Sequence, residues 1–242
     1  MKLRSKIAGF LSNKLGTETV LDITSKLILE HSDIKIALDI GSGETSHLSN
    51  FRPQIKTIGL DAHTIDVAKE NKQHDFYIKA DILKMSVEQI QHEIYKVAGV
   101  NKVDLITMYS VIEHFKKHDG LKLLEKLEVL SKRFILIETP NGFVPQGPEY
   151  GNPYQRHLSG WFPHDLIGLG YSVYGSYGTK YMRGYMGEPR IKFPGAQLLD
   201  DIVLTRMLYC KKFPQHSFNM TAIKDLEGEE ARYQSYDDPS RI

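Results

Sequence analysis

A strand-like segment that leads straight into a glycine turn limits the folds open to this chain. Residues 36–43 read IALDIGSG, so an apolar, β-branched run ends where Gly41 and Gly43 allow the backbone to turn sharply. A helix that follows such a turn points main-chain N–H groups at a bound ligand. The segment therefore predicts a buried strand whose end forms part of a binding site.

Short apolar runs and longer segments of helical periodicity alternate along the chain. We expect strands at 34–39, 55–61, 76–81, 103–108 and 134–138, later ones near 171–177 and 217–224, and helices from 163 and around 196–209. Ser86 and Gln89 form a capping box before one helix, and Asp119 is the expected cap of the next. This alternation predicts an α/β fold, a mostly parallel Rossmann-like sheet with helices on both faces.

Acidic residues stand at the ends of successive predicted strands. Asp39, Asp61 and Asp81 end the first three, and Glu113 with His114 follows the fourth. Right-handed crossovers bring the carboxyl ends of parallel strands to one edge of the sheet, where ligands of open α/β sheets bind. The sequence therefore predicts one acidic ligand site that several strand ends build together.

Two classes of nucleotide cofactor fit a glycine turn in this position. The turn nearly matches the dinucleotide fingerprint, but Ser46 stands where a third glycine is expected. Asp39 precedes the first glycine, and its carboxylate would repel a pyrophosphate but favour the ammonium and sulfonium of S-adenosylmethionine. The residues therefore favour an S-adenosylmethionine-dependent methyltransferase. The alternatives are an NAD(P)-dependent oxidoreductase and a non-catalytic cofactor-binding subunit.

The segment 38–43 resembles motif I of the class I S-adenosylmethionine-dependent methyltransferases. Residues 80–82 and 109–114 resemble later motifs of that family, and 156–170 is similar to a segment of ubiquinone-biosynthesis-type methyltransferases. The resemblance implies a seven-stranded sheet with an antiparallel last strand, and S-adenosyl-L-methionine as the cofactor. The cofactor-binding residues that it implies are Asp39, Gly41, Gly43, Asp61, Ala62, Asp81, Ile82 and Ser110.

Two histidines are candidates for removing a proton from an acceptor hydroxyl. His114, with Glu113 beside it, follows the fourth strand, and His157 follows the fifth. Histidine suits a general base near neutral pH. The sequence leaves open which of the two acts, with a slight preference for His157 because its loop carries aromatic residues.

Aromatic residues gather in the variable region 139–215, which we expect to bind the acceptor. The candidate acceptor-binding residues are Tyr154, Trp161, Tyr181 and Arg183. Residues 138–142, ETPNG, resemble a segment of bacterial methyltransferases of glycan and lipid biosynthesis. That resemblance implies O-methylation of a small molecule or a sugar.

A metal site is not expected from the sequence. His114 and His118 stand four residues apart next to Glu113, which is a spacing that can bind a metal on one helical face. No convincing third ligand accompanies them, and the neighbouring Lys116 and Lys117 favour a solvated helix start.

Composition limits partners and location. The formal charge of +1 gives no indication of a nucleic-acid partner, and the single cysteine, Cys210, is typical of a reducing, cytoplasmic compartment. We expect a helical segment at 1–30, a methyltransferase-like domain at 31–224 and a disordered tail at 225–242. Basic and apolar residues alternate over residues 1–15, which indicates at most weak membrane-surface association. The sequence does not indicate an oligomeric state.

Overall fold

A seven-stranded sheet organises the described residues, in the order β3-β2-β1-β4-β5-β7-β6. The computed structural model describes residues 20–148, 151–182, 184, 190 and 213–227. The strands are β1 Ile36–Ile40, β2 Lys56–Asp61, β3 Phe76–Lys79, β4 Val103–Tyr109, β5 Ser131–Pro140, β6 Ser172–Thr179 and β7 Ser217–Asp225. Pairing is parallel from β3 to β5, whereas β7 runs antiparallel to both β5 and β6. The predicted Rossmann-like sheet, including its antiparallel last strand, is confirmed.

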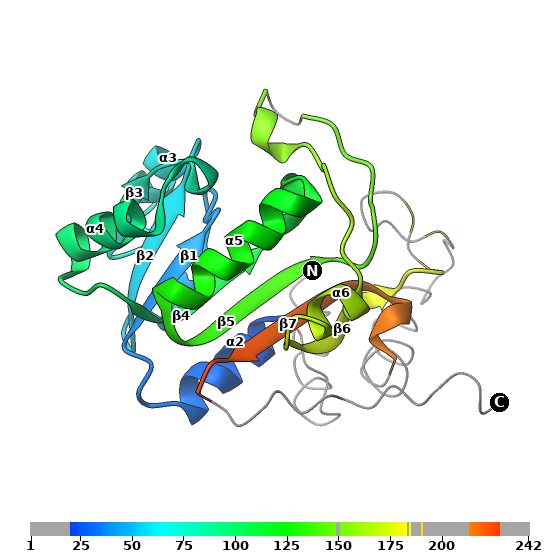
Figure 1. Cartoon of the computed structure of the whole chain (residues 1–242), viewed down its shortest axis with the longest axis horizontal. Helices are drawn as coiled ribbons and strands as arrows, with labels where there is room; N and C mark the ends of the chain where they lie inside the picture. The colour runs from blue at the N-terminus through cyan, green and yellow to red at the C-terminus, as the bar shows by residue number, and fades with distance from the viewer. Residues whose placement is uncertain (1–19, 149–150, 183, 185–189, 191–212, 228–242) are drawn as a thin grey trace, which may run out of the picture.

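Helices cover both faces of this sheet (Figure 1). They are α2 Val20–Glu30, α3 Ile65–Glu70, α4 Val87–Ala98, α5 Lys117–Leu130 and α6 Pro163–Ile167. On one face, Ile94 of α4 and Leu127 of α5 belong to the same buried cluster as Ile106. On the other face, Leu27 of α2 packs in a cluster with Leu105. Strand β4 therefore contributes alternate residues to two cores, as a central strand covered on both faces must.

The expected elements within the described residues are present, with ends shifted by a few residues. The Ser86–Gln89 capping box before α4 is confirmed. The expectation that Asp119 caps α5 is wrong: the helix starts after Lys116, and Asp119 lies in the first turn, where the helix dipole favours a carboxylate. The expected helix at 196–209, the segment 1–15 and most of the tail lie outside the described residues. None of the described helices is long and apolar enough to cross a membrane.

Trp161 anchors the loop after β5 to the core. Its side chain is fully buried, and a Cβ atom on Gly120 of α5 would lie only 2.7 Å from the indole Cζ2. The indole Nε1 donates to Ser159 Oγ at 3.0 Å, and Lys117 Nζ lies 3.7 Å from the ring centroid. The sequence suggested Trp161 as an acceptor-binding residue, but the structure places it in the hydrophobic core, because the small Gly120 leaves room for the ring against α5.

Replacing Trp161 by alanine should therefore lower the free energy of unfolding by about 3–5 kcal/mol, the usual cost of emptying a large aromatic site. Tyr181→Ala, at a side chain that is 60% exposed, is the matched control and should change it by less than about 0.5 kcal/mol. Urea unfolding measures the stability of both variants. Circular dichroism is the suitable signal, because Trp161 is the only tryptophan and its replacement removes tryptophan fluorescence. Equal stability of the two variants would contradict the core assignment.

Candidate functional site

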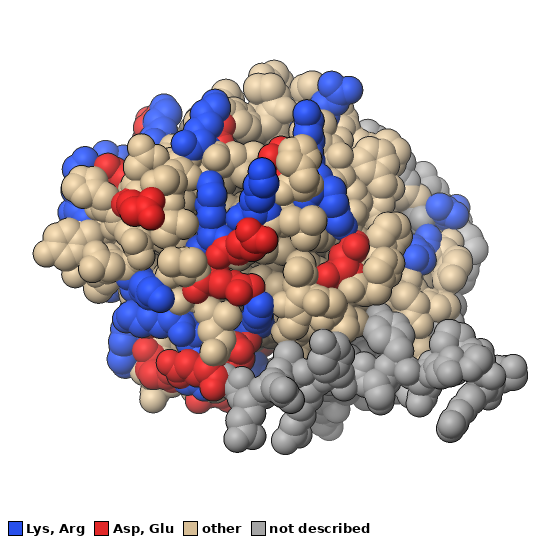
Figure 2. Space-filling model, viewed as in Figure 1, with Lys and Arg blue, Asp and Glu red and all other residues tan. Residues whose placement is uncertain are grey.

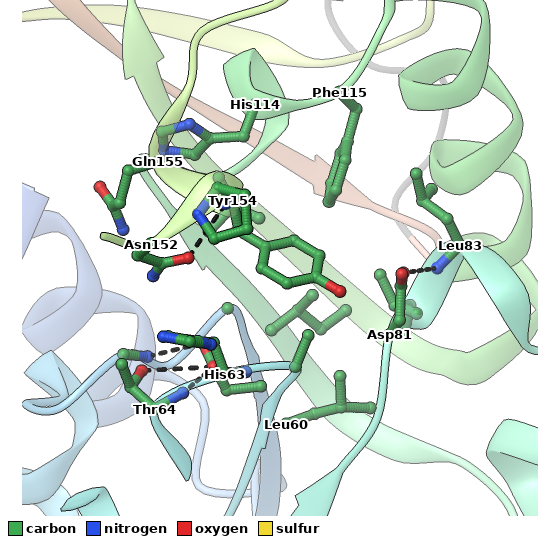
Figure 3. A pocket seen from close by; sticks show the side chains of 18 of the residues that line it. Leu60, His63, Thr64, Asp81, Leu83, His114, Phe115, Asn152, Tyr154 and Gln155 are labelled. Carbon is green, nitrogen blue, oxygen red and sulfur yellow. Dashed lines mark hydrogen bonds between the residues drawn. The ribbon is translucent and has the colours of Figure 1, made fainter. Parts of the chain in front are cut away.

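One cavity of about 300 Å³ lies at the carboxyl edge of the parallel strands. Its walls come from the glycine turn after β1, the ends of β2 and β3, and the residues that follow β4, while residues from 152–158 close over it (Figure 3). Parallel pairing places these strand ends at the same edge of the sheet. Of the residues expected to bind a cofactor, the cavity is lined by Gly41, Gly43, Asp61, Ala62, Asp81, Ile82 and Ser110.

The two glycines of the turn have different reasons to be glycine. Both adopt left-handed backbone conformations, with φ of +64° at Gly41 and +61° at Gly43. A Cβ atom on Gly41 would lie 2.5 Å from Val111 Cγ2, whereas one on Gly43 would meet no atom within 4 Å. Gly41 therefore allows the turn to pack against the segment after β4, and Gly43 keeps the cavity side of the turn open.

The Asp61 carboxylate joins the end of β2 to the glycine turn. Its Oδ2 accepts a hydrogen bond from Gly43 N at 3.2 Å, and its Oδ1 accepts bonds from His63 N and Thr64 N, both at 2.7 Å. These donors fix the orientation of a carboxylate that lines the cavity. A pre-oriented carboxylate at this position can accept hydrogen bonds from the hydroxyls of a ribose.

Asp81 lies across the cavity from the glycine turn. It follows β3 and caps the short 3-10 helix η2 (Ile82–Lys84), because its Oδ1 accepts a bond from Leu83 N at 3.1 Å. Its Oδ2 lies 3.0 Å from Lys84 Nζ. Ile82 and Ala62 add apolar surface to the same cavity. This part of the site offers a carboxylate beside an apolar surface, which suits a flat heteroaromatic ring that carries an amino group.

Asp39 is the one expected cofactor residue that does not line the cavity. Its side chain is buried, with Oδ2 accepting from Ser46 Oγ at 2.5 Å and Oδ1 from Thr107 Oγ1 at 2.7 Å. Burial raises the pKa of Asp39 to about 6, although these hydroxyl donors oppose the rise. Asp39 thus holds β1, β4 and the start of the 3-10 helix η1 (His47–Phe51) together behind the glycine turn.

Ser110 directly follows β4 and has a strained backbone conformation, with φ of +53°. Its amide donates to the Glu138 carbonyl at 2.9 Å, and its hydroxyl donates to Glu138 Oε2 at 2.9 Å. Left-handed conformations of non-glycine residues cluster at functional sites, where surrounding contacts enforce them. Here the Glu138 contacts from β5 enforce the conformation and turn the chain from β4 toward the cavity.

The structure brings Glu113, His114 and His157 together, although His157 is far from the other two in sequence. One ligand-type atom from each side chain lies within 4.8 Å of the others. The two imidazole rings meet at a centroid distance of 4.8 Å. The 3-10 helix η3 (Ile112–His114) supplies two of the residues, and the loop after β5 supplies the third. His114 lines the cavity, whereas Glu113 and His157 are buried at 2% and 9% exposure.

Main-chain hydrogen bonds hold this cluster in place. Leu158 N and Ser159 N both donate to the Glu113 carbonyl, at 2.8 and 3.1 Å, which ties the His157 loop to η3. His157 Nδ1 lies 2.6 Å from the Val144 carbonyl, and His114 Nδ1 lies 3.3 Å from the Arg156 carbonyl. A carbonyl oxygen can only accept, so each contact is a hydrogen bond in the tautomer that carries a proton on Nδ1.

Burial changes the protonation of two members of the cluster. Burial raises the pKa of Glu113 to about 8, with the nearby Glu138 carboxylate adding to the rise. Burial, together with the neighbouring His157, lowers the pKa of His114. His114 is therefore a neutral imidazole near pH 7, as either a general base or a metal ligand must be.

The remaining acceptor candidates are spread out. Tyr154 lines the cavity, and Figure 3 shows its ring extending from the closing segment with the hydroxyl toward Asp81. Tyr181 does not line the cavity; its hydroxyl lies 3.5 Å from His216 Nδ1. Arg183 lies outside the described residues. Of the expected acceptor side chains, Tyr154 is thus the one that the structure places at the cavity.

Sequence reasoning missed several residues of the closing segment. Asn152 and Gln155 line the cavity beside Tyr154. Asn152 Oδ1 accepts from Tyr154 N at 3.0 Å and caps the 3-10 helix η4 (Pro153–Gln155). The signal that could have located this segment is an asparagine that caps a helix started by proline.

Comparisons with known proteins place the chain by its fold. No protein-family model matches it, and no curated protein matches it in sequence. The N-terminal domain of EvdMO1, solved with SAH bound, aligns with a TM-score of 0.51 and 11% identity, over 86% of this chain and 82% of that one. The methyltransferase domain of bacterial CtHen1-CN aligns with a TM-score of 0.50 and 14% identity, over 85% and 97%.

A SAM-dependent methyltransferase from Archaeoglobus fulgidus covers 89% of this chain and 98% of its own, at 16% identity and a TM-score of 0.46. At such identities, similarity establishes a shared fold and nothing finer. The chain therefore has the Rossmann-like fold of methyltransferase domains.

The two turn glycines should respond differently to alanine. Gly41→Ala combines a left-handed conformation with a clash against Val111 and should lower the free energy of unfolding by about 3 kcal/mol. Gly43→Ala carries only the conformational cost of about 1–2 kcal/mol, because its Cβ has open space. Urea unfolding measures both variants. A loss at Gly43 as large as that at Gly41 would show that the packing of the turn is misplaced.

Proposed function

We propose that this chain is an S-adenosylmethionine-dependent methyltransferase that holds its cofactor in the cavity at the carboxyl edge of the sheet. The observation that carries the proposal is the meeting of Gly41, Gly43, Asp61, Asp81 and Ser110 around one cavity. These residues come from four strand ends, and the sequence motifs had marked each of them separately. The fold of methyltransferase domains agrees with the proposal.

The geometry after the glycine turn argues against a dinucleotide. A pyrophosphate is normally held at the N-terminus of an α-helix that follows the turn. Here the turn leads instead into η1, a 3-10 helix of five residues. Asp61 suits the ribose of either cofactor, so the geometry of the turn, and not this carboxylate, separates the two classes. Asp39, whose carboxylate carried the electrostatic argument from the sequence, lies buried behind the turn.

The residues present fit an adenosyl group. Asp61 offers a carboxylate that is oriented by His63 N and Thr64 N toward a ribose, and Asp81 with Ile82 offers a polar edge and an apolar surface for adenine. Gly43 leaves space for close approach to the main chain. When bound, S-adenosylmethionine supplies an electrophilic methyl carbon, whose bond to sulfur breaks as a bond to the acceptor forms.

The acceptor in this proposal is a hydroxyl of a small molecule or a sugar. Tyr154 and Gln155 from the closing segment line the cavity opposite the strand ends and offer an aromatic surface with polar groups. His114 lines the cavity, whereas His157 is buried and does not line it. We therefore assign removal of the proton from the acceptor hydroxyl to His114. This position reverses the slight preference for His157 that the sequence suggested.

The charge distribution supports a small acceptor rather than a polyanion. Figure 2 shows basic and acidic side chains interspersed over the face that it presents. The formal net charge is +1. Nucleic-acid binding depends on clustered lysines and arginines.

A cytoplasmic location, supported by the single cysteine, remains part of the proposal.

S-adenosylhomocysteine should raise the melting temperature of the protein, because a ligand that binds only the folded state stabilises it. Asp61→Ala should weaken S-adenosylhomocysteine binding by about tenfold or more, through the loss of charged hydrogen bonds to the ribose. Asp66→Ala is the matched control: this carboxylate is exposed, pairs with Lys79 and does not line the cavity, so affinity should not change. Isothermal titration calorimetry measures all three proteins.

Titration with NAD separates the alternatives. A folded sample that binds NAD but not millimolar S-adenosylhomocysteine would support the oxidoreductase and overturn the methyltransferase proposal. Binding of S-adenosylhomocysteine without methyl transfer to any acceptor from a panel of sugars and phenols would instead favour a non-catalytic subunit.

A further inference from the structure

Glu113, His114 and His157 combine one carboxyl group with two imidazoles, which are side-chain groups that bind transition metals. A carboxylate and two imidazoles place one ligand-type atom each within 4.8 Å of the others. Ligands of one divalent ion, bound at about 2.0–2.2 Å, are at most about 4.4 Å apart. Small side-chain movements therefore bring these three groups to ligand distance. The loop contacts with the Glu113 carbonyl already fix the relative positions of their main chains.

The hydrogen bonds around the cluster orient it as a ligand set. In both histidines Nδ1 lies beside a main-chain carbonyl, of Val144 and Arg156, which favours the tautomer with the proton on Nδ1. In a neutral ring, this tautomer places the lone pair on Nε2. Metal-binding histidines are commonly held in this way, with the second nitrogen donating to a carbonyl or carboxylate.

Glu113 supplies a buried oxygen atom that lacks a hydrogen-bond partner. Its Oε2 accepts a hydrogen bond from Thr139 Oγ1 at 3.0 Å, but its Oε1 is buried and has no hydrogen-bond partner among the described residues. Glu138, also buried, adds a second carboxylate nearby. The described donors to Glu138 side-chain oxygens are the Ser110 hydroxyl and the Asn219 amide, both neutral. Coordination of a metal ion would give the buried Glu113 Oε1 the partner that it lacks among the described residues.

We propose that Glu113, His114 and His157 bind one divalent transition-metal ion at the wall of the cavity. Two imidazoles and one carboxylate suit ions that accept nitrogen ligands, such as Mn²⁺, Co²⁺ or Zn²⁺, better than Mg²⁺. Three protein ligands leave coordination positions for water or substrate, as in catalytic rather than structural sites. His114 lines the cavity, so the open positions face it.

This site replaces the metal-free expectation drawn from the sequence. That expectation considered His118 as the partner of His114, and His118 is indeed unsuitable: its side chain is 64% exposed and lies 3.0 Å from Asp119. The missing third ligand is His157, which the fold brings in from the loop after β5.

The role of the ion rests on the proposed function. An acceptor hydroxyl bound to the ion would have a lowered pKa and lose its proton to solvent, which leaves a metal-bound alkoxide or phenolate as the nucleophile. The ion thereby does the work that a histidine base would otherwise do. Both histidines act as ligands and hold the acceptor oxygen at the cavity wall.

The test uses the full chain, freed of metal by a chelator and titrated without any nucleotide. Calorimetry with MnCl₂, CoCl₂ and ZnCl₂ should show one ion per chain, and bound Co²⁺ should produce visible absorption bands. Glu113→Gln and His157→Gln should each weaken binding by at least about 100-fold. His118→Gln is the matched control and should bind as the wild type does. Circular dichroism and melting temperature establish that each variant is folded.

Two results would overturn the site: a folded wild type that binds none of the three ions at about 1 mM, or binding that is undiminished in both Glu113→Gln and His157→Gln. Using two variants protects the test, because loss of the buried Glu113 charge alone can affect folding. The cofactor proposal fails separately. S-adenosylhomocysteine binding without ion binding would reject only the metal site, and ion binding without S-adenosylhomocysteine binding would reject only the cofactor.

Discussion

The pairing of β1 between β2 and β4 is the interaction on which the rest of the structure depends. Ile40 stands beside Leu60 on one side and Met108 on the other, so all three strands end at one level. The Gly41 amide then donates to the Leu60 carbonyl at 2.8 Å and starts the turn at that level. Because the strands are parallel and fully covered by helices, the polar groups of the molecule that can meet a ligand are concentrated at this edge.

The aspartates at the strand ends show how position decides the task of one residue type. Asp39 faces Ser46 and Thr107 inside the protein, where its carboxylate links β1, β4 and η1. Asp61 is one strand away and lines the cavity, yet it also holds the glycine turn through Gly43 N. Structural and ligand-binding roles therefore overlap at Asp61 but not at Asp39. A charged ligand in the cavity faces Asp61 and Asp81, with Asp39 behind the turn.

Two carboxyl groups are buried on the His114 side of the cavity. Glu113 and Glu138 are both buried, and burial raises the pKa of each. Burying the two carboxyl groups is unfavourable, but the same two residues position the site. Glu138 enforces the left-handed conformation of Ser110, and the main-chain carbonyl of Glu113 holds the His157 loop. A divalent ion at Glu113 would offset the charge and join the loop to η3. Glu113 thus has two separate parts to play: its main-chain carbonyl positions the closing segment, and its carboxyl group belongs to the proposed metal site.

The sequence by itself determined the alternating elements, the glycine turn and the acidic strand ends, because hydrophobic period and glycine conformation are local properties. It marked Asp61 and Asp81 at the ends of predicted strands and Ser110 within a motif-like segment, and all three line the cavity. Tertiary structure alone decided that Asp39 is buried, that Trp161 fills the space above Gly120, and that His157 rather than His118 joins Glu113 and His114. The physical reason is that side-chain direction and loop position depend on contacts between residues distant in sequence. Periodicity carries no information about such contacts.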